Sequence, residues 1–251
     1  MLNTADLLFG KPAKFTENIS LHIPTVEEVV YTEMYGSYTQ PLVTTTRQIF
    51  SSLEEVDKLE EQFPTIWQMS FDEEGMQILN SMFGADKSTN IIIEALSYWT
   101  KLEPDTFQAL SNKKIVNKEA DWVIDEKSFN SFSNYVKEII GYEPDLDLIA
   151  PKNMSPRKLD IWKKTYKGRM RNRQKNSMTL ADKIIILSIS MESYIPVDEI
   201  RKMTIYHFNR LYEAISEKES YEKQWDIKMS PKFDSGNGSL KHWKESIKVT
   251  K

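Results

Sequence analysis

Cysteine is absent from the 251 residues of this chain. Its absence excludes disulfide bonds, thiol nucleophiles, iron–sulfur clusters and zinc sites with thiolate ligands. Glycine is scarce, with eight residues, so the chain has few of the turns that β-sandwiches and β-barrels require. The composition therefore favours helices.

Long hydrophobic runs are missing as well. The longest aliphatic run is Ile184-Ile185-Ile186-Leu187, far shorter than the ~20 residues of a membrane-spanning helix. The first residues lack the basic and then apolar pattern of a secretory signal peptide. We therefore expect no contact with a membrane, and a protein of a reducing cytosol or of a particle assembled in one.

Motifs that carry catalytic chemistry are also missing. The sequence holds no phosphate-binding glycine loop and no nucleophile elbow, and its histidines, His22, His207 and His242, have no second ligand at a metal-binding spacing. Carboxylate clusters such as Asp72-Glu73-Glu74 lie at predicted helix starts, where negative charge is favourable without any chemistry. We expect a non-enzyme with no catalytic residue, cofactor or metal, and keep an enzyme built on paired carboxylates as an alternative.

The residues that are present suffice for a folded core and are unevenly charged. Apolar residues make up 40% of the sequence and aromatic residues 11%, which is enough buried surface to offset the entropy of folding. The net charge is −4. The segment 152–175 holds ten Lys and Arg and one acid, Asp160, for a net charge of +9, so the remaining chain carries −13. One strongly basic segment thus lies in an acidic protein.

The N-terminal half is predicted to contain one short strand followed by helices. Ile19, Leu21 and Ile23 alternate with polar residues, which predicts a half-buried strand over 14–23. The capping spacing of Thr25 and Glu28 predicts a helix start. Further helices are expected over 38–50, from Ser52 to Pro64, from Asp72 to Gly84 and from Ser88 onward.

Around residue 107 the hydrophobic period changes. Short β-like pieces at 107–110, 115–116 and 122–124 predict a hairpin or a three-stranded sheet, and Asp125 and Gly141 bound the helix that follows. The expected fold is therefore mainly α: a helix-rich α+β protein with a short N-terminal strand and a small sheet around 107–124.

The proline-containing segment 143–156 is the predicted linker. Beyond it we expect helices over 156–172, 179–193 and 204–223. The predicted organisation is a helix-rich domain with a small sheet over 1–145, a helical region over 146–227 that opens with a basic helix, and a tail over 228–251.

The predicted basic helix has two different sides. Apolar and aromatic residues recur on one narrow side, which we expect to anchor the helix: Leu159, Trp162, Tyr166 and Met170. The opposite side is expected to form a cationic ridge and is our first candidate for partner binding: Lys163, Lys164, Lys167 and Arg171. The ridge is either a solvated face, or a site for an acidic protein surface, including this chain's own, or a site for nucleic acid. The aromatic residues lie on the anchoring side, where they suit packing better than base stacking.

Two further segments suggest contacts with other chains. The helix over 179–193 is apolar nearly all round, which is typical of a central core helix or of an obligate interface, and a core position is the favoured interpretation. Trp243 follows a run of Ser, Gly and Asn, which suggests a tail that docks an aromatic anchor. Trp243 is therefore a second candidate for partner binding, on this chain's own body or on a neighbour.

Four stretches, taken in order, resemble a group of tailed-bacteriophage proteins from hosts of the Firmicutes type. They are the segments 23–29 (IPTVEEV), 180–190, 200–208 (IRKMTIYHF) and 240–243 (LKHW). That group is associated with the tail-morphogenesis genes near the tape-measure protein, and its members resemble tail assembly chaperones or accessory tail components. The acidic region 51–90 adds nothing to the likeness.

The resemblance implies a helix-rich, non-enzymatic protein that contacts other phage tail proteins, such as the tape measure, the tail tube or a connector. It also implies a location in the host cytoplasm during assembly or in the virion, and a homo-oligomer is among the expected assemblies. The main alternative is a nucleic-acid-binding accessory protein that uses the basic helix over 157–175.

Overall fold

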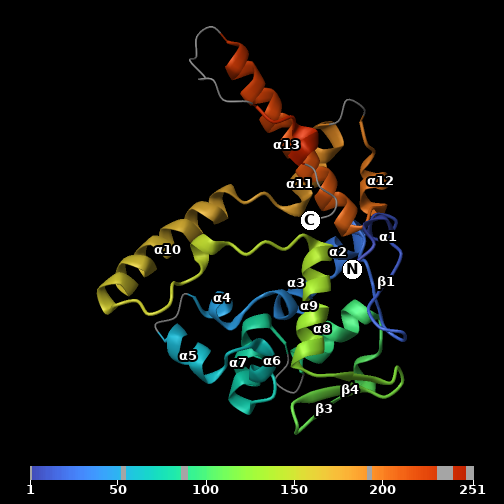
Figure 1. Cartoon of the computed structure of the whole chain (residues 1–251), viewed down its shortest axis with the longest axis vertical. Helices are drawn as coiled ribbons and strands as arrows, with labels where there is room; N and C mark the ends of the chain where they lie inside the picture. The colour runs from blue at the N-terminus through green and yellow to red at the C-terminus, as the bar shows by residue number, and fades with distance from the viewer. Residues whose placement is uncertain (1, 52–54, 86–89, 191–193, 231–239, 247–251) are drawn as a thin grey trace. The chain divides into compact units, whose positions relative to one another are not determined.

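The computed structural model describes residues 2–51, 55–85, 90–190, 194–230 and 240–246. These residues form a helix-rich α+β structure with one two-stranded and one three-stranded sheet, which confirms the predicted fold class (Figure 1). The chain divides into two compact units. Unit 1 comprises 1–11, 23–31 and 178–251, and unit 2 comprises 12–22 and 32–177. The units do not coincide with the predicted ranges 1–145, 146–227 and 228–251, which stay a prediction about folding domains.

Unit 1 is built from helices that come from both ends of the sequence. Its elements are α1 (Thr4–Leu8), α2 (Val26–Tyr31), α11 (Leu180–Ser190), α12 (Val197–Lys202), α13 (Ile205–Met229) and α14 (Trp243–Ser246). The long helix α13 buries Ile205, Phe208 and Ile215 along one side. This is the apolar stripe that its sequence period indicates.

Thr204, which is buried, connects the N-terminal and C-terminal parts of unit 1. Its hydroxyl caps α13 by accepting from the backbone of His207 at 3.0 Å and donates to the carbonyl of Leu7 at 3.0 Å. An isolated antiparallel bridge joins Thr204 to Thr25. Thr25 in turn forms the predicted capping box with Glu28, with hydrogen bonds of 2.8 and 3.2 Å. Two of the stretches behind the phage resemblance, 23–29 and 200–208, are therefore neighbours in the fold.

Unit 2 begins with a small two-stranded ribbon. β1 (Ala13–Lys14) and β2 (Ser20–Leu21) pair antiparallel, so the single strand predicted over 14–23 is wrong and a hairpin stands in its place. The alternation that prompted the prediction is real, because Ile19, Leu21 and Ile23 are all buried. The pairing strand β1 ends five residues before Ile19 and is only two residues long, so it leaves no periodic signal of its own.

Helices form the body of unit 2. They are α3 (Tyr35–Val43), α4 (Thr46–Phe50), α5 (Val56–Gln62), α6 (Ile66–Met69), α7 (Glu73–Phe83), α8 (Ile91–Thr100) and α9 (Glu126–Ile140). The helix predicted over 38–50 is in fact two, α3 and α4. The chain is extended at Thr44 and Thr45, and the Thr45 side chain caps α4 in a capping box with Gln48. Threonine prefers a cap to a helix interior, which explains the break.

The other predicted helix ends of unit 2 agree with the structure where it describes them. In unit 1, the helix predicted over 204–223 continues to Met229 as α13 and so enters the range predicted as the tail. Asp72 caps α7 and Gly84 ends it in the left-handed conformation, and Asp125 and Gly141 do the same for α9. The predicted cap at Ser52 and the predicted start at Ser88 lie outside the described residues. Helix α5 ends at Gln62, before Pro64, and α8 is capped by Asn90.

The predicted three-stranded sheet is confirmed as an antiparallel meander. It follows the short 3₁₀ turn η1 (Pro104–Thr106) and consists of β3 (Phe107–Leu110), β4 (Lys114–Asn117) and β5 (Trp122–Ile124). Trp122 and Phe132 of α9 pack with Phe15 in edge-to-face or tilted geometry, with ring centroids 5.4–6.0 Å apart. The meander, α9 and the N-terminal ribbon thus share one aromatic core.

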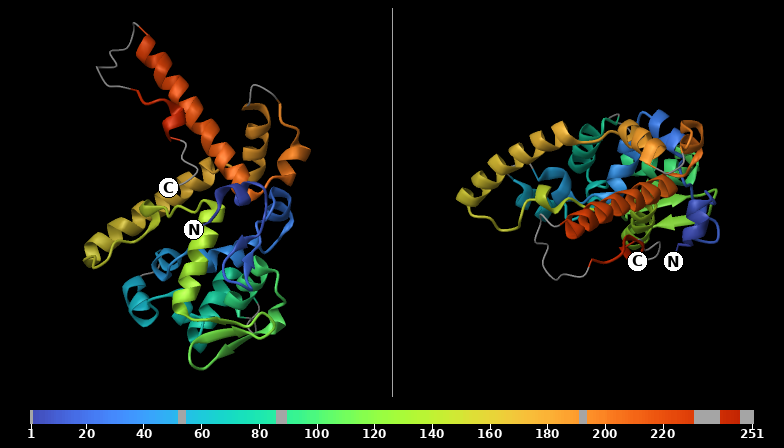
Figure 2. Two further views of the ribbon diagram at one scale, coloured as in Figure 1. Left: turned by 45° about the vertical axis from the view of Figure 1, so that its right-hand side comes forward. Right: turned by 90° about the horizontal axis from the view of Figure 1, so that it is seen from above.

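The predicted linker 143–156 contains the 3₁₀ turn η2 (Leu146–Leu148) and the buried Ala150, and it leads into α10 (Pro156–Asn176). Figure 2 shows α10 as one uninterrupted helix. Its bounds confirm the helix predicted over 156–172 and extend it by about one turn. The linker is therefore partly packed against unit 2 rather than a free connection.

A buried arginine holds this linker in place. The Arg47 guanidinium of α4 donates to Glu60 at 2.7 and 2.9 Å and to the carbonyls of Ala150 and Pro151 at 3.0 and 3.4 Å, and it also pairs with Asp57. Only 7% of the Arg47 side chain is exposed. Burial lowers the pKa of Arg47, but its hydrogen bonds to Glu60 and Asp57 outweigh burial and raise it. The charge is thus kept inside by matched partners.

Arg47→Ala should destabilise unit 2 by about 2–3 kcal/mol, because it removes a buried donor from two carbonyls and two carboxylates. Urea unfolding at neutral pH measures the change. Lys58→Ala, which breaks the exposed ion pair with Glu55, is the control and should have little effect. Equal losses in the two variants would contradict the assigned role of Arg47.

The hydrogen bond from Arg47 also lowers the pKa of Glu60 below its ordinary value. The stability that this pair contributes is therefore present above the ordinary glutamate pKa, about 4.3, and is lost as the pH falls through the lower folded value. Glu60→Gln should flatten the decline of unfolding free energy with falling pH in this window. An unchanged pH profile in Glu60→Gln would refute the coupling.

Candidate interaction surfaces

The four residues of the predicted cationic ridge lie on α10 and are not equivalent. Lys164, Lys167 and Arg171 are exposed. Lys163 is half-buried, because it is four residues after Leu159 and three before Tyr166 and therefore lies at the edge of the apolar stripe rather than opposite it. The expectation that all four lie on the side opposite the apolar stripe therefore fails for Lys163.

The anchoring stripe of α10 is only partly covered. Trp162 and Tyr166 are half-buried and stack on each other, with ring centroids 4.9 Å apart and planes at 29°. No side chain of α10 that the structure describes is fully buried. The aromatic faces are engaged with one another, as the sequence pattern favours, and are not presented as a platform for bases.

Two arginines of α10 bind acids of the segment before the helix. Arg169 donates to the carbonyl of Asp147 at 2.5 Å and lies 3.7 Å from the carboxylate of the same residue. Arg173 forms an ion pair with Asp145, whose side chain also caps η2. Part of the positive charge of α10 is therefore matched within unit 2, by arginines that lie outside the predicted ridge, and the alternatives for the ridge stay open.

Five other basic residues of α10 point to a second side of the helix. We call them the exposed basic row: Arg157, Lys164, Lys167, Arg171 and Lys175. Within the described ranges no ion pair joins any of them to an acid. Lys164 and Lys167, Lys167 and Arg171, and Arg171 and Lys175 are three or four residues apart, a spacing at which like charges destabilise a helix. The row therefore costs folding stability.

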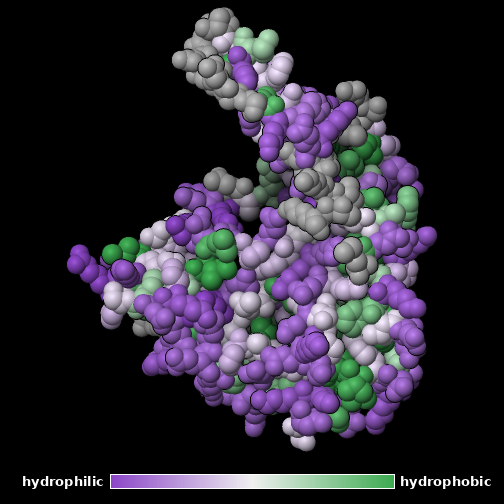
Figure 3. Space-filling view, in the orientation of Figure 1, coloured by the Kyte–Doolittle hydropathy of each residue, from purple (hydrophilic) through white to green (hydrophobic). Residues whose placement is uncertain are grey.

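Helix α11 exposes isoleucine in spite of its apolar sequence. Leu187 is fully buried, but Ile185 and Ile189, one turn apart, are 59% and 68% exposed. Tyr194 and Val197, just beyond the helix, are 66% and 46% exposed. Figure 3 shows hydrophobic surface in this part of unit 1 among hydrophilic residues. The favoured interpretation of α11 as a core helix is therefore wrong for its outer side, which we call the α11 apolar face (Ile185 and Ile189).

His242, the residue before the predicted aromatic anchor Trp243, packs on helix α13 of unit 1. His242 packs against Tyr221 of α13 at 5.0 Å between ring centroids and stacks with Trp243 at 5.7 Å. Tyr221 stacks in turn with Trp225, which is 46% exposed. Trp243 is half-buried. The contact with α13 is made by His242, so partner binding by Trp243, on this chain's own body or on a neighbour, stays a prediction.

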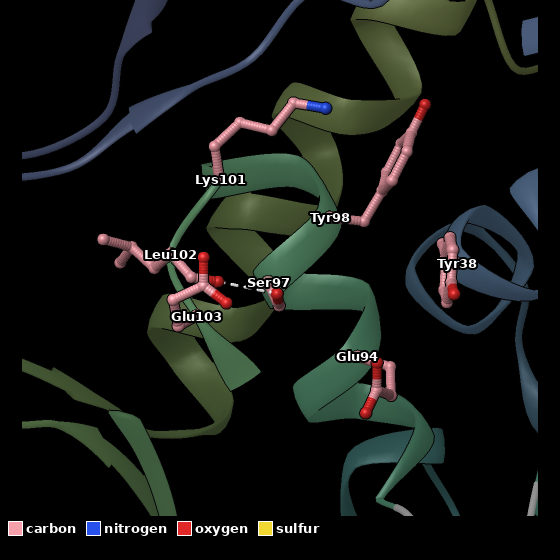
Figure 4. Close-up of a pocket in the computed structure, with 7 residues that line it drawn as sticks. All are labelled: Tyr38, Glu94, Ser97, Tyr98, Lys101, Leu102 and Glu103. Carbon is pink, nitrogen blue, oxygen red and sulfur yellow. Dashed lines mark hydrogen bonds between the residues drawn. The ribbon is translucent and has the colours of Figure 1, made fainter. Parts of the chain in front are cut away.

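A cavity of about 460 Å³ lies in unit 2 between α3 and the C-terminal end of α8 (Figure 4). It is lined by Tyr38, Glu94, Ser97, Tyr98, Lys101, Leu102 and Glu103. Tyr38 and Tyr98 stack at 5.2 Å, and Lys101 Nζ lies 4.8 Å from the centre of the Tyr98 ring. The Ser97 hydroxyl donates to the carbonyl of Leu102 at 2.6 Å. No histidine lines the cavity, so Ser97 has no imidazole base beside it there.

The histidines and the acidic clusters are dispersed in the fold. Burial lowers the pKa of His207, which is half-buried on α13, and His242 is part of the aromatic stack. Among the described residues no three side chains of His, Asp or Glu converge as metal ligands do. Nor does any helix in those residues reach the length and hydrophobicity needed to span a membrane. The absence of catalysis and of a metal stays a prediction.

Three features were not predicted from the sequence: the buried charge of Arg47, the exposure of the α11 apolar face, and the pairing of Tyr38 with Tyr98 in the cavity. A signal existed only for α11, whose hydrophobicity on all sides permits either burial or an interface. Tyr38 and Tyr98 come together because α3 packs against α8, and no motif in either helix predicts that packing.

Lys167→Glu should raise the melting temperature of the protein by roughly 1–3 °C, because it replaces like-charge neighbours by attractive ones at Lys164 and Arg171. Thermal unfolding followed by circular dichroism measures the shift at low ionic strength. Lys114→Glu, an exposed charge reversal on β4, is the control. A lower melting temperature for Lys167→Glu than for the control would show that the row is matched in the folded chain.

Comparison with known proteins matches part of the chain to a protein family. Residues 172–248 match the family model described as the second domain of YomV, a phage-encoded Bacillus protein. The matched range contains the end of α10 and helices α11 to α14. No curated protein and no solved structure matches the chain. Over most of the C-terminal part of unit 1, the chain is thus similar to a phage protein, which supports the phage origin indicated by the sequence.

Proposed function

We infer that this chain is a non-enzymatic bacteriophage protein that acts in tail assembly or tail structure through contacts with other tail proteins, such as the tape measure, the tail tube or a connector. The observation that carries the proposal is the α11 apolar face, which lies within the segment similar to a phage protein. Two isoleucines exposed one turn apart offer a small apolar surface that a partner could cover.

The energetics of the α11 apolar face suit a protein partner. Complete burial of one isoleucine contributes about 1.5–3 kcal/mol, and more than half of each of the two side chains is still available for burial. An amphipathic helix of a partner, such as a tape-measure helix, could pack along Ile185 and Ile189 in the helix-in-groove mode. The same contact would shield apolar surface on the client while the tail is being built.

The location follows from the same proposal. A tail-assembly factor would act in the host cytoplasm and either leave after assembly or stay in the virion. Additional copies of the chain are among its candidate partners. A mass-spectrometric inventory of purified particles separates a structural component from a chaperone.

Co-expression of the tagged chain with the tape-measure and tail-tube proteins of the same phage tests the proposal directly. We expect at least one of them to co-purify in a stable complex. Recovery of the free chain alone, from cells in which the other proteins are soluble and abundant, would count decisively against a tail-assembly role.

Ile185→Gln combined with Ile189→Gln should reduce this co-purification at least about tenfold while leaving the melting temperature within a few degrees of wild type, because both side chains are already exposed. Met82→Gln combined with Val123→Gln is the matched control, since these residues are exposed and lie in unit 2 outside α10. Equal complex formation by the two double variants would place the contact elsewhere on the chain.

A further inference from the structure

We propose that the exposed basic row of α10 (Arg157, Lys164, Lys167, Arg171 and Lys175) is a docking surface for a carboxylate-rich segment of a partner protein. The inference rests on the proposed function in taking the partner to be a protein, and it adds the chemistry by which that partner is recognised. The row lies in unit 2, whereas the α11 apolar face lies in unit 1.

The first argument is that α10 already binds carboxylates in this fold. Arg169 and Arg173 hold Asp147 and Asp145 on one side of the helix. Arg157, Lys164, Lys167, Arg171 and Lys175 are all exposed and, in the described part of the chain, have no acidic partner. Arg169 and Arg173 thus form ion pairs with carboxylates within the fold, and the exposed basic row could form the same ion pairs with carboxylates of a second molecule.

The second argument is the arrangement of the row. Arg157, Lys164 and Arg171 are seven residues apart, so they recur about every 10 Å, and the row from Arg157 to Lys175 is about 27 Å long. A partner helix with acids at seven-residue intervals, packed along α10, would present a carboxylate to each of them. Asp160 is the one acid on this side of α10 and makes no ion pair within the described residues.

The third argument separates protein from nucleic acid. Trp162 and Tyr166 are stacked on each other at the anchoring side and do not offer faces to single-stranded bases. Outside 152–175 the chain has a net charge of −13, which opposes the approach of a long, uniformly charged polyanion. A short acidic segment that matches only the row avoids most of this repulsion. Carboxylates on a protein are therefore the favoured ligand.

The test compares two probes on the full-length protein by fluorescence anisotropy. One is a labelled helical peptide rich in Glu, and the other is labelled duplex DNA of the same total charge, each at about 50 and about 300 mM NaCl. We expect the peptide to bind more tightly than the DNA, and to bind more weakly at the higher salt concentration.

Three variants locate the site. Lys164→Glu, Lys167→Glu and Arg171→Glu together should weaken peptide binding more than tenfold. Lys114→Glu, Lys118→Glu and Lys127→Glu together make the same change in net charge on exposed positions of unit 2 outside α10, and should weaken it less than threefold. Asp160→Asn removes the opposing charge from the row and should tighten binding about twofold. Circular dichroism confirms that each variant is folded.

The inference is overturned if DNA binds as tightly as the peptide or more tightly, since the row would then be a phosphate-binding surface. It is equally overturned if neither probe binds, or if the two triple variants lose binding alike. The proposed function is tested separately, by co-purification. If tail proteins co-purify with the Lys164→Glu, Lys167→Glu and Arg171→Glu triple variant as they do with wild type, then the assembly contacts do not need the exposed basic row. If wild type binds the peptide but captures no tail protein, the proposed function is contradicted, while the inference that the exposed basic row binds carboxylates still holds.

Discussion

A single buried guanidinium organises the part of unit 2 on which α10 depends. Arg47 joins α4 to α5 through Glu60 and Asp57, and it joins both helices to the chain at Ala150 and Pro151. A charge with this little exposure persists in a fold only where its donors are matched, and here they are. The geometry of α4, α5 and the segment 150–151 is therefore fixed jointly, and none of the three can shift without leaving a buried donor or acceptor unpaired.

This constraint extends to the start of α10. Glu60 accepts from Arg47 and also pairs with Lys152 at 3.2 Å, four residues before the helix begins. Asp145 and Asp147 then hold Arg173 and Arg169, farther along the same helix. α10 is thus secured by polar contacts near its beginning and in its last turns rather than by a buried apolar stripe. Polar anchoring uses the charge on one side of the helix and leaves the other side available to solvent or to a partner.

The features that sequence predicts well in this chain are local ones. Asp72, Asp125, Gly84 and Gly141 mark the ends of α7 and α9 because a cap needs only a few neighbouring residues. The meander over 107–124 is predicted for the same reason, since its strands are joined by short turns. The break between α3 and α4 is also local, but the competing cap at Thr45 outweighs the helical period around it.

Features that depend on distant residues could not be predicted. Nothing near Arg47 in the sequence indicates that the carbonyls of Ala150 and Pro151 receive its hydrogen bonds, and nothing near Thr25 indicates its bridge to Thr204. The candidate surfaces show the same limit. Helical period places Lys164, Lys167 and Arg171 on one side of α10 and Lys163 nearer the stripe, but only the fold shows that Arg169 and Arg173 are already occupied.

In the proposed binding, the two surfaces would contribute different physical effects. Charge acts over about a Debye length and raises the rate of encounter, whereas apolar contact acts only after docking and slows dissociation. Repulsion between the like charges of the exposed basic row lowers the stability of the free chain. The α11 apolar face lowers it as well, because its isoleucines remain exposed to water. Loss of either surface would stabilise the free chain, and a bound partner would offset the cost of keeping it. That reasoning connects a chain without a recognisable catalytic motif to a role in assembly.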